Sequence, residues 1–266
     1  MRSQCTPLPV SCSSTTNRPD RWGSANRRPR YPILRLVACA ISLAGCAEDR
    51  ARRLDEADQA YSLRAGDETL AALARLPDDA EALWRIARIE VWLGRPENGR
   101  AAAERAVALD PRSGEALLWA GYAGALAIAA RPVGERLIEA PLVESRLRAA
   151  LEVDPSAARA HVGLAILALA LAQEPADFPR DLPDPALHLR VARELRPGLT
   201  EPHLLLARIH LARGDPEAAA RDLEPLLGDA PEAMDGPNWP DAQVSEWAAA
   251  SRQARALRAA LFRLPE

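Results

Sequence analysis

The chain has 266 residues, of which 34 are basic and 37 acidic, and its formal net charge is −3. Every basic residue is arginine, which excludes chemistry that needs a Schiff-base, phosphate-loop or kinase-type lysine. The acidic balance also argues against nucleic acid as a partner, because binding to it requires a basic face.

Residues 1–45 have the pattern of a leader and lipoprotein signal peptide. Nine uncharged residues, 36–44, follow an arginine-rich stretch. This run is too short to span a bilayer, which takes about 20 residues, but it fits the apolar centre of a secretory signal. It ends in Leu43-Ala44-Gly45-Cys46, which resembles the lipobox of bacterial lipoproteins. The alternative is a short core helix that contains cysteine.

The lipobox resemblance implies that the chain is cut before Cys46 and that this thiol carries lipid. Ala47, rather than aspartate, follows the cysteine, and in lipoproteins this favours export to the outer membrane. The expected location is therefore periplasmic, with a lipid anchor in the outer membrane.

The part from residue 46 onward is acidic and contains no cysteine after Cys46. The first 45 residues hold seven arginines and one acid, which leaves 27 arginines and 36 acids, a net charge of about −9. This part therefore has no disulfide and no thiolate metal site. Its 221 residues are enough to form a hydrophobic core.

A repeat organises the chain beyond this point. Five helical runs end in a similar way at a proline, with intervals of 34, 44, 42 and 34 residues, at Pro77, Pro111, Pro155, Pro197 and Pro231. A 34-residue period is typical of the tetratricopeptide repeat (TPR), a helix–turn–helix unit. Proline ends the second helix because it lacks an N–H donor and disfavours helix in the residue before it.

The first helix of each predicted unit carries the pattern large-x-x-large-small, which allows two helices to approach closely at the small residue. The four sets are Leu83, Ile86 and Ala87; Leu117, Ala120 and Gly121; His161, Leu164 and Ala165; and His203, Leu206 and Ala207. Glycine and proline in "LGRPEN" (93–98) and "RGDPEA" (213–218) predict the turn to the second helix.

Period and pattern predict an all-α, TPR-type solenoid of about four to five helix pairs over residues 46–235, of which 47–76 form a degenerate first unit. An irregular segment and a C-terminal capping helix, from about 241 to 262, are expected within 236–266, because solenoids need atypical ends. The middle units are longer by ten and eight residues, at 130–141 and 173–185. Such insertions map to one edge of a solenoid, so we expect these two to be neighbours.

A closer resemblance is carried by the lipobox together with "LLWAGYAGALAIA", "RLRAALEVDP", "ARAHVGLAILALALA" and "DPEAAARDLEPLL". This combination resembles the periplasmic TPR lipoproteins associated with TRAP-type solute transporters. The resemblance covers roughly residues 46–260. It implies a helper protein that binds a transporter's solute-binding partner, with a homo-oligomer as a further option. It implies no catalytic residue.

The four histidines could indicate a metal site. His203 and His210 are seven residues apart and share a helix face, which could form half of one. His161 and His203, however, occupy positions that large packing residues usually hold, and His210 follows at a matching position. We therefore expect these histidines to fill the core, and we expect no metal and no cofactor.

A second stripe lies beside the packing stripe of the first well-formed unit. Trp84, Arg88 and Trp92 are spaced four apart, about one residue off the stripe through Leu83. That offset predicts a position on the concave face, exposed in the free monomer, and aromatics and arginine often anchor interfaces. Tyr122 and Arg208 have comparable offsets in later units. The alternative is that the tryptophans pack on the preceding unit.

The sequence contains no nucleophile–base pair, glycine-rich phosphate loop or helical zinc motif, so an enzyme is not expected. Our interpretation is a lipid-anchored TPR scaffold whose concave face binds another protein or peptide. The alternative is a direct small-solute carrier that works with a transporter. A closed apolar cavity would favour the solute, and an open groove would favour the protein.

Overall fold

A computed structural model of the chain describes residues 48–56, 58, 70–71, 73, 79–173, 184–228 and 242–261. The chain divides into two compact units, 1–45 and 46–266. The predicted signal peptide and Cys46 lie outside the described residues. Within those residues the regular structure is helical and no strand occurs, which confirms the all-α prediction.

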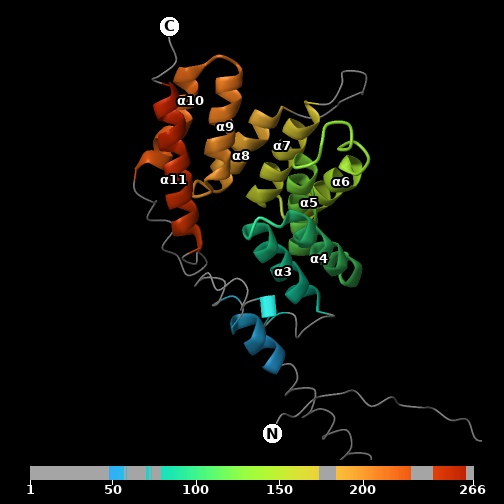
Figure 1. The fold of residues 1–266 in the computed structure, drawn as a ribbon. Coiled ribbons are helices and arrows are strands. Elements are labelled where there is room, and N and C mark those ends of the chain that lie inside the picture. Colours follow the sequence, from blue (N-terminus) through green and yellow to red (C-terminus); the bar gives the residue numbers. More distant parts are fainter. Residues whose placement is uncertain are drawn as a thin grey trace, which may run out of the picture. The chain divides into compact units, whose positions relative to one another are not determined.

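Four helix pairs follow one another along the described chain (Figure 1). The first helices are α3 (Ala80–Trp92), α5 (Gly114–Ala129), α7 (Ala158–Leu171) and α9 (Glu201–Ala212). The second helices are α4 (Pro96–Leu109), α6 (Ala140–Val153), α8 (Pro185–Leu195) and α10 (Pro216–Leu223). Each first helix packs on its own second helix, and α5 also packs on α3 and α7. This stacking is that of a TPR-type solenoid.

Turn and cap residues fix where the helices begin and end. Gly94 and Gly214 have φ of 76° and 75°, a left-handed conformation that favours glycine, and each lies in the turn between the helices of a pair. The Asp79 carboxylate caps α3 by accepting from the N–H groups of Glu81 and Ala82, at 2.9 and 3.2 Å. Asp215 caps α10 in the same way. The predicted glycine–proline turns are therefore confirmed.

Small residues allow the helices of neighbouring pairs to approach closely. A Cβ atom added at Gly121 would lie 2.6 Å from Cγ of Leu147, and one added at Gly163 would lie 2.7 Å from Cδ2 of the same leucine. Leu147, on α6, is fully buried between these two positions on α5 and α7. The large-x-x-large-small pattern predicted this close approach at Gly121.

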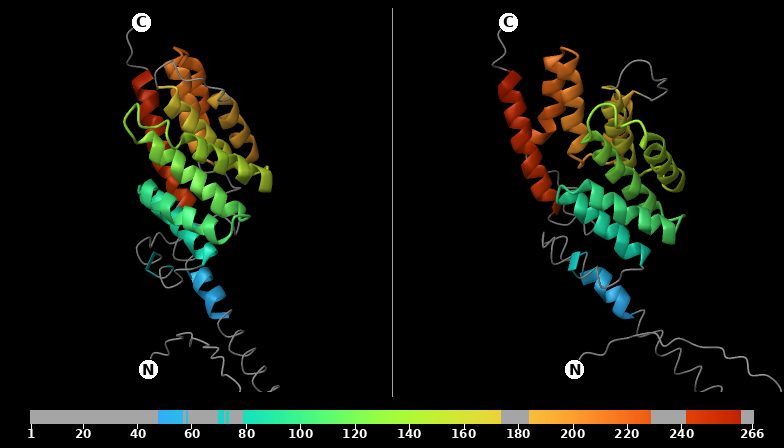
Figure 2. Two further views of the ribbon diagram at one scale, coloured as in Figure 1. Left: turned by 90° about the vertical axis from the view of Figure 1, so that its right-hand side faces the viewer. Right: turned by 45° about the vertical axis from the view of Figure 1, so that its right-hand side comes forward.

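A 3₁₀ turn, η1 (Glu224–Leu227), follows α10, and α11 (Ala242–Leu261) is the last described helix. α11 packs on η1, α10 and α9, and Figure 2 shows it running beside them. Trp247, Ala250 and Ala254 of α11 share a buried cluster with Leu223 and Leu226. α11 therefore covers the end of the solenoid, as predicted for a capping helix. Among the described helices, none is long and apolar enough to cross a membrane.

A buried arginine connects the first insertion to the next unit through hydrogen bonds. Arg136 is 7% exposed, and its Nη1 donates to the carbonyl oxygen of Ala170 and to Oε1 of Gln173, both at 2.8 Å. Gln173 begins the second predicted insertion, so the two insertions meet at this contact, as predicted. Residues 174–183 lie outside the described residues.

One glutamate of the first insertion, Glu139, pairs with Arg100 of α4 and with Arg131. Glu144, on α6, pairs with Arg148 of the same helix, and Glu135 is exposed. The Arg100 guanidinium, followed by that of Arg131, holds the pKa of the Glu139 carboxyl below its usual range. The pair with Arg100 joins the insertion to α4.

Replacing Gly121 with Val should destabilise the domain by about 1–3 kcal/mol, because the new methyl groups overlap Leu147 in a filled core. Gly228→Val is the matched control, since Gly228 has a φ of −84° and no atom within 4 Å of an added Cβ. Its effect should stay within about 0.5 kcal/mol. Urea unfolding followed by circular dichroism measures both, and equal effects would show that the α5–α6 contact can relax.

Candidate functional site

A cavity of about 340 Å³ lies on the side of the solenoid formed by the first helices and is open on one side. All four first helices line it, and α11 supplies a further wall through Ala249, Ala250 and Gln253. We call it the groove cavity. Its charged and aromatic lining consists of Arg88, Trp92, Trp119, Tyr122, Arg159 and Glu201, and Thr200 and Gln253 add neutral polar groups.

An aromatic and charged corner joins three helices at this cavity. The rings of Trp119 and Tyr122, on α5, are 5.8 Å apart and nearly perpendicular. The Arg159 guanidinium of α7 lies 5.8 and 5.9 Å from their centroids, within reach of a cation–π interaction. Glu201, at the start of α9, accepts from Nη1 of Arg159 at 2.9 Å and from the Tyr122 hydroxyl at 3.4 Å. Three successive units therefore meet through polar contacts.

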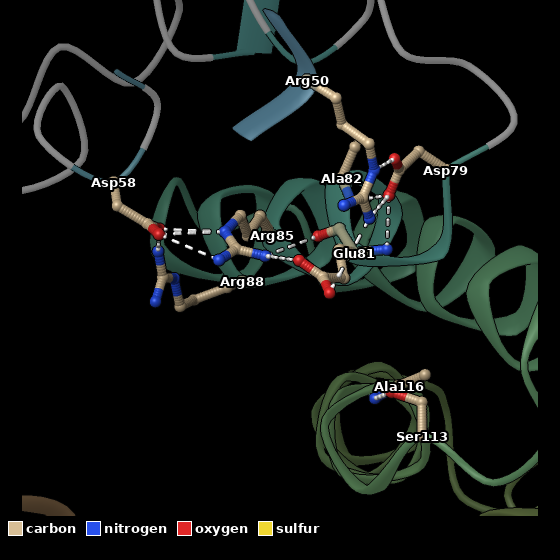
Figure 3. Close-up of polar contacts among 9 residues, drawn as sticks. All are labelled: Arg50, Asp58, Asp79, Glu81, Ala82, Arg85, Arg88, Ser113 and Ala116. Atoms are coloured by element: carbon tan, nitrogen blue, oxygen red, sulfur yellow. Dashed lines mark hydrogen bonds and ion pairs between the residues drawn. The ribbon is translucent and has the colours of Figure 1, made fainter. Parts of the chain in front are cut away.

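The α3 side of the groove cavity is held by an acid from the preceding segment. Asp58 accepts from Arg85 and Arg88 of α3, at 3.0 and 2.8 Å (Figure 3). Figure 3 shows both guanidinium groups turned toward this carboxylate. The same two groups lie 4.3 and 5.4 Å from the ring centroid of Trp84.

The structure brings together three of the five residues predicted for the groove. Arg88, Trp92 and Tyr122 line the same cavity, whereas Trp84 and Arg208 do not. Trp84 lies beneath the arginines of its own helix and against the main core, and Arg208 is exposed. The expectation that Trp84, Arg88 and Trp92 are exposed in the monomer was wrong, since each is half-buried.

This burial has two sources. Asp58 covers the arginines, and Trp92 packs against the small cluster formed by Leu54, Leu73, Ala82 and Ile89. The alternative interpretation, in which a tryptophan packs on the preceding segment, therefore holds in part for Trp92, which also lines the cavity.

Sequence reasoning missed Trp119, Arg159, Glu201 and the α11 residues. A signal for two of them was present in the repeat register. Two residues before the first large packing residue, the four units carry Glu81, Glu115, Arg159 and Glu201. The arginine among three glutamates marks the position where a charge pair can form between neighbouring units.

Two histidines form a pair between α7 and α8. Nδ1 of His161 lies 3.0 Å from Nδ1 of His188, so one ring donates and the other, which must be neutral at Nδ1, accepts. Burial lowers the pKa of both rings, and the charges of His161 and Arg148 lower that of His188 further. His161 thus occupies a packing position, as predicted, but its neighbour there is polar.

The other two histidines both contact Asp222, a neighbour that sequence spacing did not reveal. Nδ1 of His203 lies 3.2 Å from the carbonyl oxygen of Asp222, and Nε2 of His210 lies 3.5 Å from its Oδ2. Packing of α10 on α9 brings Asp222 next to these two rings. His203 is buried as predicted, and burial lowers its pKa. No group of three or more metal-ligating side chains occurs among the described residues.

Comparison with known proteins identifies the fold. No family model and no curated protein matches the sequence. Among solved structures, the TPR protein TTC0263 of Thermus thermophilus aligns over 80% of this chain and 99% of its own, at 21% identity and a TM-score of 0.58. MamA of Desulfovibrio magneticus aligns over 65% and 90%, at 19% identity and a TM-score of 0.45.

The match to TTC0263 shows that this chain has the TPR fold, in agreement with the repeat period and the helix pairs. At 21% identity the match concerns the fold alone.

The histidine pair predicts a pH-dependent stability. Because burial lowers the folded-state pKa below the ordinary value of 6.5, the stabilising effect of the neutral pair is complete above pH 6.5 and is lost as the pH falls. His188→Gln should reduce the amount by which the free energy of unfolding falls between pH 7 and 5. Part of the fall should remain, because burial also lowers the pKa of His203. Urea unfolding across this range measures the slope, with His210→Gln as control. If the free energy of unfolding of His188→Gln depends on pH as steeply as that of the wild type, the histidine pair is not the source of the pH dependence.

Proposed function

We propose that the chain is a protein-binding scaffold whose groove cavity receives part of another protein. The observation that carries this proposal is the cavity itself. It is built from the equivalent faces of all four first helices, and aromatic and arginine side chains line it. Such side chains are enriched at the energetic centres of protein interfaces.

The shape and lining of the cavity favour a protein over a free solute. A direct solute carrier calls for a closed, apolar cavity, whereas this one is open on one side and contains two arginines and a glutamate. A partner can place one or two side chains in the cavity and extend over the neighbouring helices. No observation favours an enzymatic role for the residues that line it.

We also propose that this scaffold works in the periplasm, held to the outer membrane by lipid on Cys46. Support comes from the arginine-rich leader, the nine uncharged residues and the Leu-Ala-Gly-Cys sequence. The likeness to TPR lipoproteins of TRAP-type systems makes a transporter's solute-binding protein the first partner to test, with self-association as the second.

Trp92→Ala should weaken capture of the partner by about 1–3 kcal/mol, because it removes an aromatic wall of the groove cavity. The assay immobilises the chain and quantifies bound envelope proteins by mass spectrometry. Leu187→Ala is the control, since Leu187 is 54% exposed on α8 and lies outside the cavity. Thermal unfolding of both variants is measured in parallel. Unchanged capture by Trp92→Ala would contradict the proposal, and destabilisation by ~3 kcal/mol or more would assign Trp92 to the core.

Cys46→Ser should release the protein from the outer-membrane fraction and change its mass, because acylation and cleavage depend on the thiol. Stable anchoring takes two or more acyl chains, and the variant lacks the thiol that begins acylation. The loss of anchoring should therefore be complete rather than partial. Fractionation and intact-mass measurement report the outcome. If the variant keeps the wild-type distribution and mass, the anchor is elsewhere or absent.

A further inference from the structure

One carboxylate oxygen in the groove cavity has no hydrogen-bond donor. Oε1 of Glu201 accepts from Arg159 and from Tyr122, but Oε2 is buried and has no partner among the described residues. A buried acceptor without a donor costs free energy, and an ionised carboxylate can accept several hydrogen bonds. Glu201 therefore keeps an unused capacity for an N–H donor at the wall of the cavity.

An incoming group can reach this carboxylate. The Glu201 side chain is 30% exposed, and its residue lines the cavity. Oε2 is buried in the free protein, but the terminal torsion of glutamate is broad, so a partial rotation of the carboxylate can turn this oxygen toward a donor that enters the cavity.

The surroundings of Glu201 already accommodate a guanidinium. The Arg159 group lies 5.8 and 5.9 Å from the ring centroids of Trp119 and Tyr122 and is only 15% exposed. The ring faces thus stabilise positive charge that is largely withdrawn from water. Trp92 extends the aromatic lining on the α3 side.

The charges that line the cavity do not oppose a further cation. Arg88 is neutralised by Asp58, and Arg159 by Glu201. Glu115, next to the same corner, accepts from Nε1 of Trp119 at 3.1 Å and adds negative charge. The corner formed by Glu115, Trp119, Tyr122, Arg159 and Glu201 includes two carboxylates and one guanidinium, and Arg196 at the end of α8, which interacts with both Glu115 and Arg159, balances the second carboxylate. The corner therefore has no excess of positive charge.

We propose that the groove cavity binds a single basic side chain, arginine or lysine, of the protein partner, and that Glu201 is its anchor. The cavity of about 340 Å³ accepts one long side chain but not a helix, whose diameter is about 10 Å. The basic group donates to Glu201 and its stem lies along the rings of Trp92 and Trp119. This proposal rests on the proposed function and names the chemistry that the scaffold recognises.

The test compares two nearly isosteric probes, N-acetyl-arginine methylamide and its neutral counterpart N-acetyl-citrulline methylamide. NMR titration of the tryptophan indole N–H signals of the purified full chain gives the Kd of each. The arginine probe should bind about tenfold more tightly, because a charge-assisted hydrogen bond to carboxylate is about twice as strong as a neutral one. N-acetyl-glutamate methylamide, the anionic probe, should not bind at the same sites.

Glu201→Gln should bring the arginine probe to the affinity of the citrulline probe. Glu217→Gln is the matched control, since Glu217 is exposed on α10 and outside the cavity, and it should leave the preference intact. Thermal unfolding checks that both variants are folded, and should Glu201→Gln unfold, the wild-type probe comparison decides alone. Equal binding of the two probes, preference for the anionic probe, or an unchanged preference in folded Glu201→Gln would overturn the proposal.

The two proposals can fail separately. If Trp92→Ala abolishes partner capture while the arginine and citrulline probes bind equally, the scaffold function stands and the basic anchor is wrong. If the arginine preference is present but Trp92→Ala captures protein as well as wild type does, the cavity recognises a cation without serving as the docking site. Binding of the arginine probe together with loss of capture in Glu201→Gln supports both.

Discussion

The spacing between the second and third units depends on one leucine. Leu147 of α6 lies between Gly121 of α5 and Gly163 of α7, and there is no room for a Cβ atom at either glycine. This contact sets how closely α5 and α7 approach, and therefore where Tyr122 and Arg159 lie. Their meeting with Glu201 of α9 forms the corner of the groove cavity. The site thus follows from packing of residues that never contact a partner.

Local sequence signals were sufficient to predict the fold. The proline period, the paired large and small positions, and the glycines at 94 and 214 each depend on interactions within about one repeat. The helical offset also identified Arg88, Trp92 and Tyr122, because equivalent positions on stacked first helices face the same side. The helical period determines the direction in which each side chain leaves the helix, so it predicts which side chains share a face.

The rest of the site could not be predicted because it depends on neighbours distant in sequence. Arg208 is the equivalent of Arg88 and Tyr122, yet it is exposed and does not line the cavity. Asp58 and Asp222 approach their partners only after their segments pack. Arg159 and Glu201 share one position of the repeat, but Asp58 and Asp222 contact residues of other segments, and the periodic pattern does not reveal these contacts.

The buried contact of Arg136 has a consequence for how the solenoid opens. Stability in repeat proteins is approximately a sum of terms for each unit and for each interface between neighbours. Arg136 belongs to the insertion of the second unit, but it bonds to the end of α7 in the third. Unfolding either unit alone would leave this guanidinium, or the carbonyl of Ala170, without its partner. The two units should therefore behave as one cooperative block, and opening of one without the other should be disfavoured.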